Sequence, residues 1–193
     1  NQEARVSQVF RYMATTKRVC LVHYHEIGLK GKNRGFFENQ LVTNLKFALK
    51  DTPVTTVRRI SGYLLVTCKG DATEAEANLI AQVPGVARVS MAHECPREED
   101  VYCQAAIDAL GEAQDFKTFK VHAHKSSTDY KMHTLDINRL VGSKLCEAFP
   151  DKKVDVHHPD VTIHVNVVQG VVLFMRSRSG RSVDCPSVLP AKS

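Results

Sequence analysis

The spacing of apolar residues predicts an ordered series of strands and helices in the first half of the chain. Alternating, β-branched apolar residues are typical of strands, whereas apolar residues three or four positions apart are typical of a helix with one buried face. The predicted strands are at 18–24, 54–60 and 63–69, with a turn and a fourth strand within 83–92. The predicted helices are at 35–50, with Phe37, Leu41, Leu45 and Ala48 on its apolar face, and at 72–82, where Thr73 is a plausible cap. The order strand, helix, strand, strand, helix, strand predicts a ferredoxin-like (split βαβ) domain.

The second half of the chain predicts another unit of mixed helices and strands. Residues 93–100, HECPREED, are polar and indicate a boundary. The elements predicted after it are helices at 99–113 and 134–149 and strands at 116–125, 161–168 and 171–177. The fold class is therefore α+β, with an N-terminal arm at 1–17 that includes a short helix at 5–14, domains at 18–92 and 93–180, and a linker at 181–193.

Charge divides the chain into three parts. The net charge of the 193 residues is +5, but residues 1–60 carry +7, residues 61–115 carry −7 and residues 116–193 carry +5. Two basic ends around an acidic middle suit a nucleic-acid or phosphate partner, although ordinary clustering of surface charge is an open alternative. No apolar run is long enough for a membrane span and no signal peptide is evident, so a cytoplasmic protein with no membrane partner is expected.

The six cysteines form no CxxC pair, which favours reduced thiols over a disulfide framework. Cys20, Cys68 and Cys146 lie in apolar segments and are predicted to be buried. Cys185 lies in the polar tail and is a weak candidate for a nucleophile, because no base lies near it in the sequence.

A glycine-rich basic turn, HEIGLKGKNRGFFENQL at 25–41, joins the first predicted strand to the first predicted helix. Its glycines allow the backbone to approach a phosphate closely, and the start of the helix adds N–H groups and a positive dipole end. The predicted phosphate-binding residues of this turn are Lys30, Lys32, Asn33 and Arg34. The alternative is a solvated turn in which Glu26 pairs with Lys30 or Arg34.

This stretch resembles the motif Y-G-E-I-x-L-K-G-K-N-R of the tRNA 4-thiouridine sulfurtransferases, a family that in some organisms also takes part in thiamine biosynthesis. The matching residues are Tyr24, Glu26, Ile27, Leu29, Lys30, Gly31, Lys32, Asn33 and Arg34. FKVHAHK at 119–125 and the segment 135–167 resemble the family's THUMP domain, an RNA-binding module, and VLPAKS at the end resembles its linker. His25 stands where the family has Gly, and His122 and His124 stand where it has Arg.

The resemblance implies the tRNA-binding half of such an enzyme, a ferredoxin-like domain followed by a THUMP domain. It implies that this half positions tRNA, including its acceptor end, for ATP-dependent thiolation in a separate domain. Neither the family's S-G-G-x-D-S loop nor a P-loop occurs in the sequence, so no catalytic residue is assigned and the chain is not expected to be active alone. ATP, Mg and a sulfur-donor protein are expected to act only through that catalytic domain, and a homodimer is left open.

Further basic residues of the second half are candidates for RNA contact. Strand alternation places Lys120, His122 and His124 on one face, next to Lys125. The other candidates are Arg139 and Lys144 on the helix and Arg176, Arg178 and Arg181 near the end of the last strand. A metal site built from His122 and His124, with His157 or His158, lacks a third ligand at diagnostic spacing, so no metal is assigned.

The chain has no Trp and exposed aromatic residues are expected to be scarce, so readout by base stacking is not predicted. Two other functions stay open. One is a protein-interaction or dimerisation module that docks through the acidic middle. The other is a self-sufficient enzyme that uses Cys185 or a His cluster.

Overall fold

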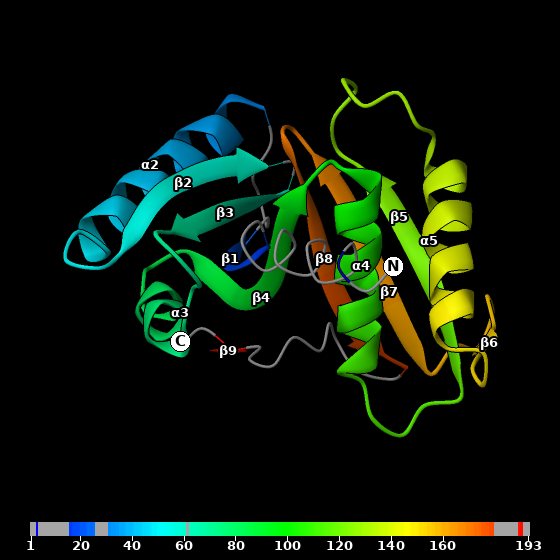
Figure 1. Ribbon diagram of the computed structural model, residues 1–193. Coiled ribbons are helices and arrows are strands. Elements are labelled where there is room, and N and C mark those ends of the chain that lie inside the picture. The colour runs from blue at the N-terminus through cyan, green and yellow to red at the C-terminus, as the bar shows by residue number, and fades with distance from the viewer. Residues whose placement is uncertain (1–2, 4–15, 26–30, 61, 180–188, 191–193) are drawn as a thin grey trace. The chain divides into compact units, whose positions relative to one another are not determined.

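The computed structural model describes residue 3 and residues 16–25, 31–60, 62–179 and 189–190, which fall into two compact units (Figure 1). One unit is built from residues 18–92 together with Leu189–Pro190. The other is built from residues 93–179, and residues 3, 16 and 17 are grouped with it. The helix predicted at 5–14 and most of the predicted linker lie outside the described residues. No helix in the described part of the chain is both long and apolar enough to cross a membrane.

The first unit has the predicted ferredoxin-like order of elements. They are β1 (Lys17–Tyr24), α2 (Lys32–Ala48), β2 (Val54–Ile60), β3 (Tyr63–Cys68), α3 (Glu74–Ala81) and β4 (Val86–Pro96). The strands lie in the order β2-β3-β1-β4, and β3 pairs antiparallel with both β1 and β2. β9 (Leu189–Pro190) pairs with β4 at Arg88 and Val89.

Local chemistry explains where the helices of this unit begin. Thr73 caps α3 in a capping box, and the Glu76 carboxylate accepts a hydrogen bond from the Thr73 N–H at 2.8 Å. α2 begins after Gly31, whose φ of +56° is a left-handed conformation that glycine adopts at no steric cost.

The buried face of α2 differs from the prediction at its end. Leu41, Leu45 and Leu49 are buried, whereas Ala48 is exposed. The apolar residues therefore recur at steps of four throughout, and the fourth position of the stripe belongs to Leu49. Phe37 packs near Gly85, where an added Cβ would lie 3.0 Å from the phenylalanine ring.

The second unit is a sheet that carries two helices on one face. Its elements are the end of β4, α4 (Glu99–Gly111), β5 (Thr118–Lys125), α5 (Thr134–Ala148), β6 (Lys153–Val154), β7 (Val161–Val168) and β8 (Val171–Arg178). The strand order is β4-β8-β7-β5-β6, with β5 parallel to β6 and β7 and with β8 antiparallel to β7. A core that includes Tyr102, Leu110, Phe119, Ile137 and Phe174 fills the space between α4, α5 and the sheet.

The structure differs from the sequence analysis at three points, two corrections and one additional strand. Residues 93–96 continue β4 and pair with β8, so this polar stretch is a strand whose hydrogen-bonding partners lie further along the chain. β6 was not predicted, since two residues carry no periodicity. Cys146 is exposed, because α5 buries the stripe of Ile137, Val141 and Leu145 and the next residue points away from it.

Candidate nucleic-acid interface

The first turn of α2 places positive charge at the positive end of the helix dipole. Lys32 and Arg34 lie in this turn, and it holds no acidic residue. A cation at this end is unfavourable for the isolated helix, whereas an anion is stabilised there. Lys32 and Asn33 are exposed. The turn is therefore suited to bind an anion such as a phosphate, while Lys30 lies outside the described residues.

Arg34 is engaged inside its own unit. Its Nε donates to Glu38 Oε1 at 3.2 Å and its Nη2 donates to the Tyr24 hydroxyl at 3.2 Å. The Tyr24 hydroxyl in turn donates to Glu38, and Arg59 Nη1 lies 3.7 Å from Glu38 Oε2. Burial and the Glu38 hydrogen bond raise the pKa of Tyr24. Arg34 thus ties α2 to β1, which leaves Lys32 as the more available cation of this turn.

On β5 the predicted alternation holds. The parallel pairing with β7 sets Lys120 beside Thr162, His122 beside His164, and His124 beside Asn166, so the three candidates share a face. His122 and His124 are exposed and Lys120 is partly exposed.

His164 extends this face towards β8. Its ring lies 5.8 Å from the His122 ring, and its Nε2 is 2.7 Å from the Ser177 hydroxyl. Burial lowers the pKa of His164, and the charges of His122 and Lys120 lower it further. The neutral form of His164 is therefore favoured, and Lys120 is the lysine that gives this face its positive charge.

A groove of about 230 Å³, the β5 groove, lies between β5, α5 and the short β6. Both Lys120 and Arg139 line it. Its apolar lining includes Phe119, Val121 and Val154. Arg139 is 81% exposed, and its Nη1 lies 3.9 Å from Asp136 Oδ1. This long surface ion pair contributes little to stability. A groove with two cations above an apolar floor can accept a phosphate together with a sugar or base.

Lys144 lies on another side of α5 from Arg139, since five residues correspond to about 140° around a helix. Its Nζ is 4.0 Å from Glu147 Oε2, again as a surface pair. Asn138, which also lines the groove, is held in place because its Oδ1 accepts a hydrogen bond from the Ala123 N–H at 2.8 Å.

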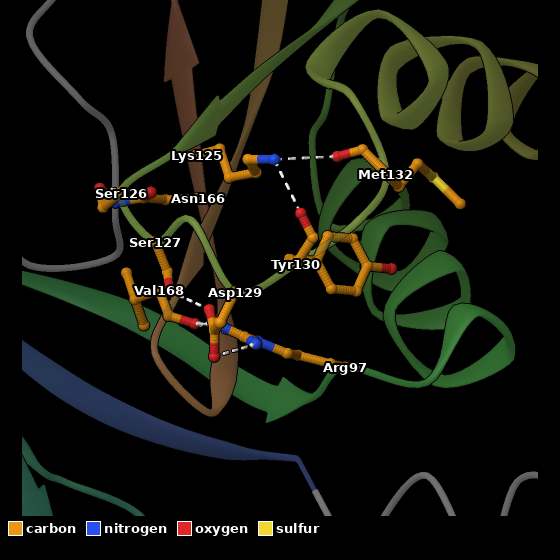
Figure 2. A network of polar contacts seen from close by, with 9 residues as sticks. All are labelled: Arg97, Lys125, Ser126, Ser127, Asp129, Tyr130, Met132, Asn166 and Val168. Carbon is orange, nitrogen blue, oxygen red and sulfur yellow. Dashed lines mark hydrogen bonds and ion pairs between the residues drawn. The ribbon is translucent and has the colours of Figure 1, made fainter.

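Lys125 is tied down by the loop that follows β5 (Figure 2). Its Nζ donates to the carbonyl oxygens of Tyr130 and Met132 at 2.7 and 3.4 Å. Arg97, which the sequence analysis did not single out, holds the same loop. It donates two hydrogen bonds of 2.9 Å to the Asp129 carboxylate and one of 3.0 Å to the Val168 carbonyl (Figure 2). These hydrogen bonds and the Arg97 charge help to hold the pKa of Asp129 at about 2. Both cations therefore order the loop.

Arg176 and Arg178 lie on the opposite face of the sheet from His122. They pair with Ile163 and Val161, which belong to the buried core under the helices. Arg176 Nη1 donates to the Ala109 carbonyl at 3.1 Å and lies 3.7 Å from Glu112 Oε2, and Arg178 Nη2 donates to the Gln114 carbonyl. Arg176 thus satisfies a carbonyl group in the last turn of α4, and Arg178 satisfies one just after the helix. Arg181 lies outside the described residues.

His157 and His158, which the sequence analysis considered as possible metal ligands with His122 and His124, instead take part in a turn through their backbone N–H groups. The N–H groups of His157 and His158 donate to the Asp155 carboxylate at 3.1 and 2.9 Å, which closes a turn before β7. Within the described residues, no group of three or more His, Cys, Asp or Glu is placed to hold a metal ion.

Exposed aromatic residues are few among the described residues, as expected, but the two that are present lie on one helix, α2. Phe36 is 75% exposed and Phe47 is 72% exposed. They lie eleven residues apart on a helix whose opposite side is buried. The sequence signal for an exposed aromatic residue was the adjacent pair Phe36-Phe37. Two neighbouring residues of a helix point about 100° apart, so Phe36 points away when Phe37 lies on the packed side.

Comparison with known proteins identifies two domains. Residues 19–90 match the ThiI ferredoxin-like domain and residues 98–175 match the THUMP domain. A probable tRNA sulfurtransferase of Caldanaerobacter subterraneus subsp. tengcongensis is 35% identical over 158 residues, which are 82% of this chain and 41% of that protein. One of Agathobacter rectalis is 38% identical over 157 residues, 78% of this chain and 39% of that protein. The chain thus spans about two fifths of the length of these relatives.

Solved structures have the same fold. A 4-thiouridine synthetase, crystallised as an RNA complex with bound ATP, is 29% identical with a TM-score of 0.66, over 88% of this chain and 42% of that chain. PH1313 from Pyrococcus horikoshii Ot3 also has a TM-score of 0.66, at 23% identity over 83% of this chain and 55% of that chain.

Proposed function

Because the chain consists of a ThiI ferredoxin-like domain followed by a THUMP domain, as in the tRNA sulfurtransferases, we propose that it binds tRNA and positions it for thiolation. The acceptor end is the part of the tRNA that the proposal places on this chain. The ATP-dependent chemistry, the magnesium and the sulfur donor belong, in this proposal, to the part of the relatives' length that this chain does not span.

The observation that carries the proposal is a set of exposed cations that, among the residues the structure describes, have weak acidic partners or none. Lys32 lies in a helix turn that has no acidic residue, and Arg139 beside the β5 groove has only a distant surface partner at 3.9 Å. Other cations of the same sequence are used internally, as the contacts of Arg34 and Arg176 illustrate. The exposed cations suit the sugar-phosphate backbone of RNA, which they can bind without reading base identity.

The RNA complex of a similar protein supports this choice of ligand. The 4-thiouridine synthetase in that complex is 29% identical to this chain, and the match covers 88% of this chain. The β5 groove also has the mixed apolar and cationic lining that an unpaired nucleotide requires.

Fluorescence anisotropy with a labelled, unmodified tRNA transcript tests the proposal over 50 to 200 mM KCl. If about four phosphates are contacted, affinity should fall about 10²-fold over this range. Lys32→Gln and Arg139→Gln should each reduce the slope of log K against log salt by about 0.7–0.9, the contribution of one phosphate contact. Lys69→Gln, which removes an exposed lysine at the end of β3, is the control for net charge. Affinity that does not change with salt, or that responds equally to Lys69→Gln, would refute the proposal.

A further inference from the structure

The solvent side of α2 is an acid-free surface that carries two exposed phenylalanines. Successive residues of a helix are about 100° apart around its axis, so each residue can be given an angle relative to Phe36. The residues from about 80° on one side of Phe36 to about 40° on the other form one side of α2, about 120° wide. We define it as the α2 outer face, and its residues are all exposed: Lys32, Phe36, Asn39, Gln40, Thr43, Lys46 and Phe47. Glu38, the one acidic residue in the α2 sequence, lies on the far side of the helix and is engaged by Arg34 and Arg59.

The two phenylalanine rings are not needed for packing in their own unit. Phe36 is 75% exposed and Phe47 is 72% exposed, whereas Leu41 and Leu45 hold the buried side with exposures of 1% and 0%. Eleven residues of helix place the two rings about 16 Å apart along the axis. A single exposed apolar residue is ordinary, but two rings on one cationic helix face form a patterned surface.

Cations flank the rings directly. The Lys50 ammonium, just after the end of α2, lies 4.8 Å from the centre of the Phe47 ring. Lys46 is the residue before Phe47 in the sequence, and Lys32 lies one helical turn before Phe36. Lysine is depleted from the cores of protein–protein interfaces, whereas lysines interleaved with aromatic rings suit a strand of nucleic acid whose bases stack on the rings.

We propose that the α2 outer face binds an unpaired stretch of RNA, with Phe36 and Phe47 stacking on bases and Lys32, Lys46 and Lys50 bound to phosphates. Stacking requires bases that are free of a duplex, so the ligand is a single-stranded segment of the tRNA rather than its helical stem. The inference rests on the proposed function and adds to it a second contact surface, of a different chemical kind from the β5 groove.

The test separates stacking from charge. A labelled tRNA transcript and a labelled oligo(U) 12-mer are titrated with the wild-type chain and with Phe36→Ala/Phe47→Ala. Loss of both rings should weaken binding about tenfold per ring, within the range measured for base–aromatic stacking, and should leave the salt slope unchanged. Lys32→Gln/Lys46→Gln should instead lower that slope by about 1.4, which is 0.7 for each single-strand phosphate.

Two substitutions at the same positions distinguish stacking from general apolar contact. Phe→Trp keeps a stacking surface and should preserve affinity, whereas Phe→Leu keeps apolar area without a ring and should bind as weakly as Ala. Because the chain has no Trp, Phe47→Trp also supplies a single fluorophore that stacked bases should quench. Leu79→Ala on α3, which removes another exposed apolar side chain of the same unit, is the matched control and should bind as wild type.

Three results would overturn the inference while the proposed function stands. The first is that the double Ala variant binds tRNA with wild-type affinity, and the second is that the Leu variants do so. The third is that the double Ala variant changes its oligomeric state while RNA binding is unchanged, which would make the α2 outer face a protein contact. Failure of the wild-type chain to bind tRNA would overturn both proposals. A melting temperature equal to that of wild type shows that the variants are folded.

Discussion

The stability of α2 variants gives a direct measure of which side chains the fold uses. Leu45 is 0% exposed and packs in the core of the first unit. Leu45→Ala should lower the free energy of unfolding by about 2–5 kcal/mol, because the transfer free energy of the lost methyl groups adds to that of the cavity left behind.

Phe47, two residues further along the same helix, should behave differently. It is 72% exposed and so buries about a quarter of a side chain whose full burial is worth about 3 kcal/mol, or roughly 0.8 kcal/mol. Alanine has the higher helix propensity, which returns about 0.5 kcal/mol. Phe47→Ala should therefore change stability by less than about 0.5 kcal/mol, and the same reasoning applies to Phe36→Ala.

Urea denaturation followed by far-UV circular dichroism measures these differences, with the m-value compared among variants to show that the same transition is observed. The larger side chain should thus be the less costly one to remove. A loss above 2 kcal/mol for Phe47→Ala, or below 1 kcal/mol for Leu45→Ala, would refute the reasoning. The first result would mean that Phe47 is packed against protein and is not free to meet RNA.

Three further predictions concern other parts of the two units. Gly85→Ala should destabilise the first unit by about 2–4 kcal/mol in the same urea assay, because φ is +96° and the new Cβ would meet the Phe37 ring at 3.0 Å, whereas Gly170→Ala, with φ +87° and no atom within 4 Å, should cost less. Arg176→Ala should lower stability by about 1.5–3 kcal/mol through its hydrogen bond to the Ala109 carbonyl, while Arg139→Ala should leave stability unchanged. Burial, then the Arg88 charge, lowers the pKa of His23 to about 4, so the unfolded chain binds the proton first. Unfolding free energy measured at pH 7, 5.5 and 4.5 should therefore fall between pH 6.5 and 4, less steeply in His23→Gln.

Periodicity predicted most of the elements because each element buries one face. The strand at 18–24 and the helix at 72–82 were found because their alternation or capping is local, and Thr73 does form the capping box. Residues 93–96 were misassigned because their strand partners lie in β8, more than seventy residues away. Polar residues on a strand that gains its hydrogen bonds from so distant a segment resemble a loop when only neighbours are considered.

The candidate cations could be found from the sequence but not sorted by it. Alternation shows that Lys120, His122 and His124 share a face, and it would show the same for Arg176 and Arg178. It does not show that α4 covers the face of Arg176, whose guanidinium reaches a carbonyl of that helix. The covering of a sheet face depends on tertiary contacts, so an arginine that binds carbonyl groups and an arginine that is free for RNA have the same local pattern.

The exposed phenylalanines, in contrast, were within reach of the sequence. A helix that buries Leu41 and Leu45 has a fixed solvent side. Eleven residues are close to three full turns, so Phe36 and Phe47 must share that side. Composition counts eight phenylalanines and gives no positions, which led to the expectation that exposed aromatics are scarce. A residue that departs from the apolar stripe of its own helix is not accounted for by folding. A pair of such residues, flanked by lysines on a side of the helix that has no acidic residue, is better explained by a ligand than by the core.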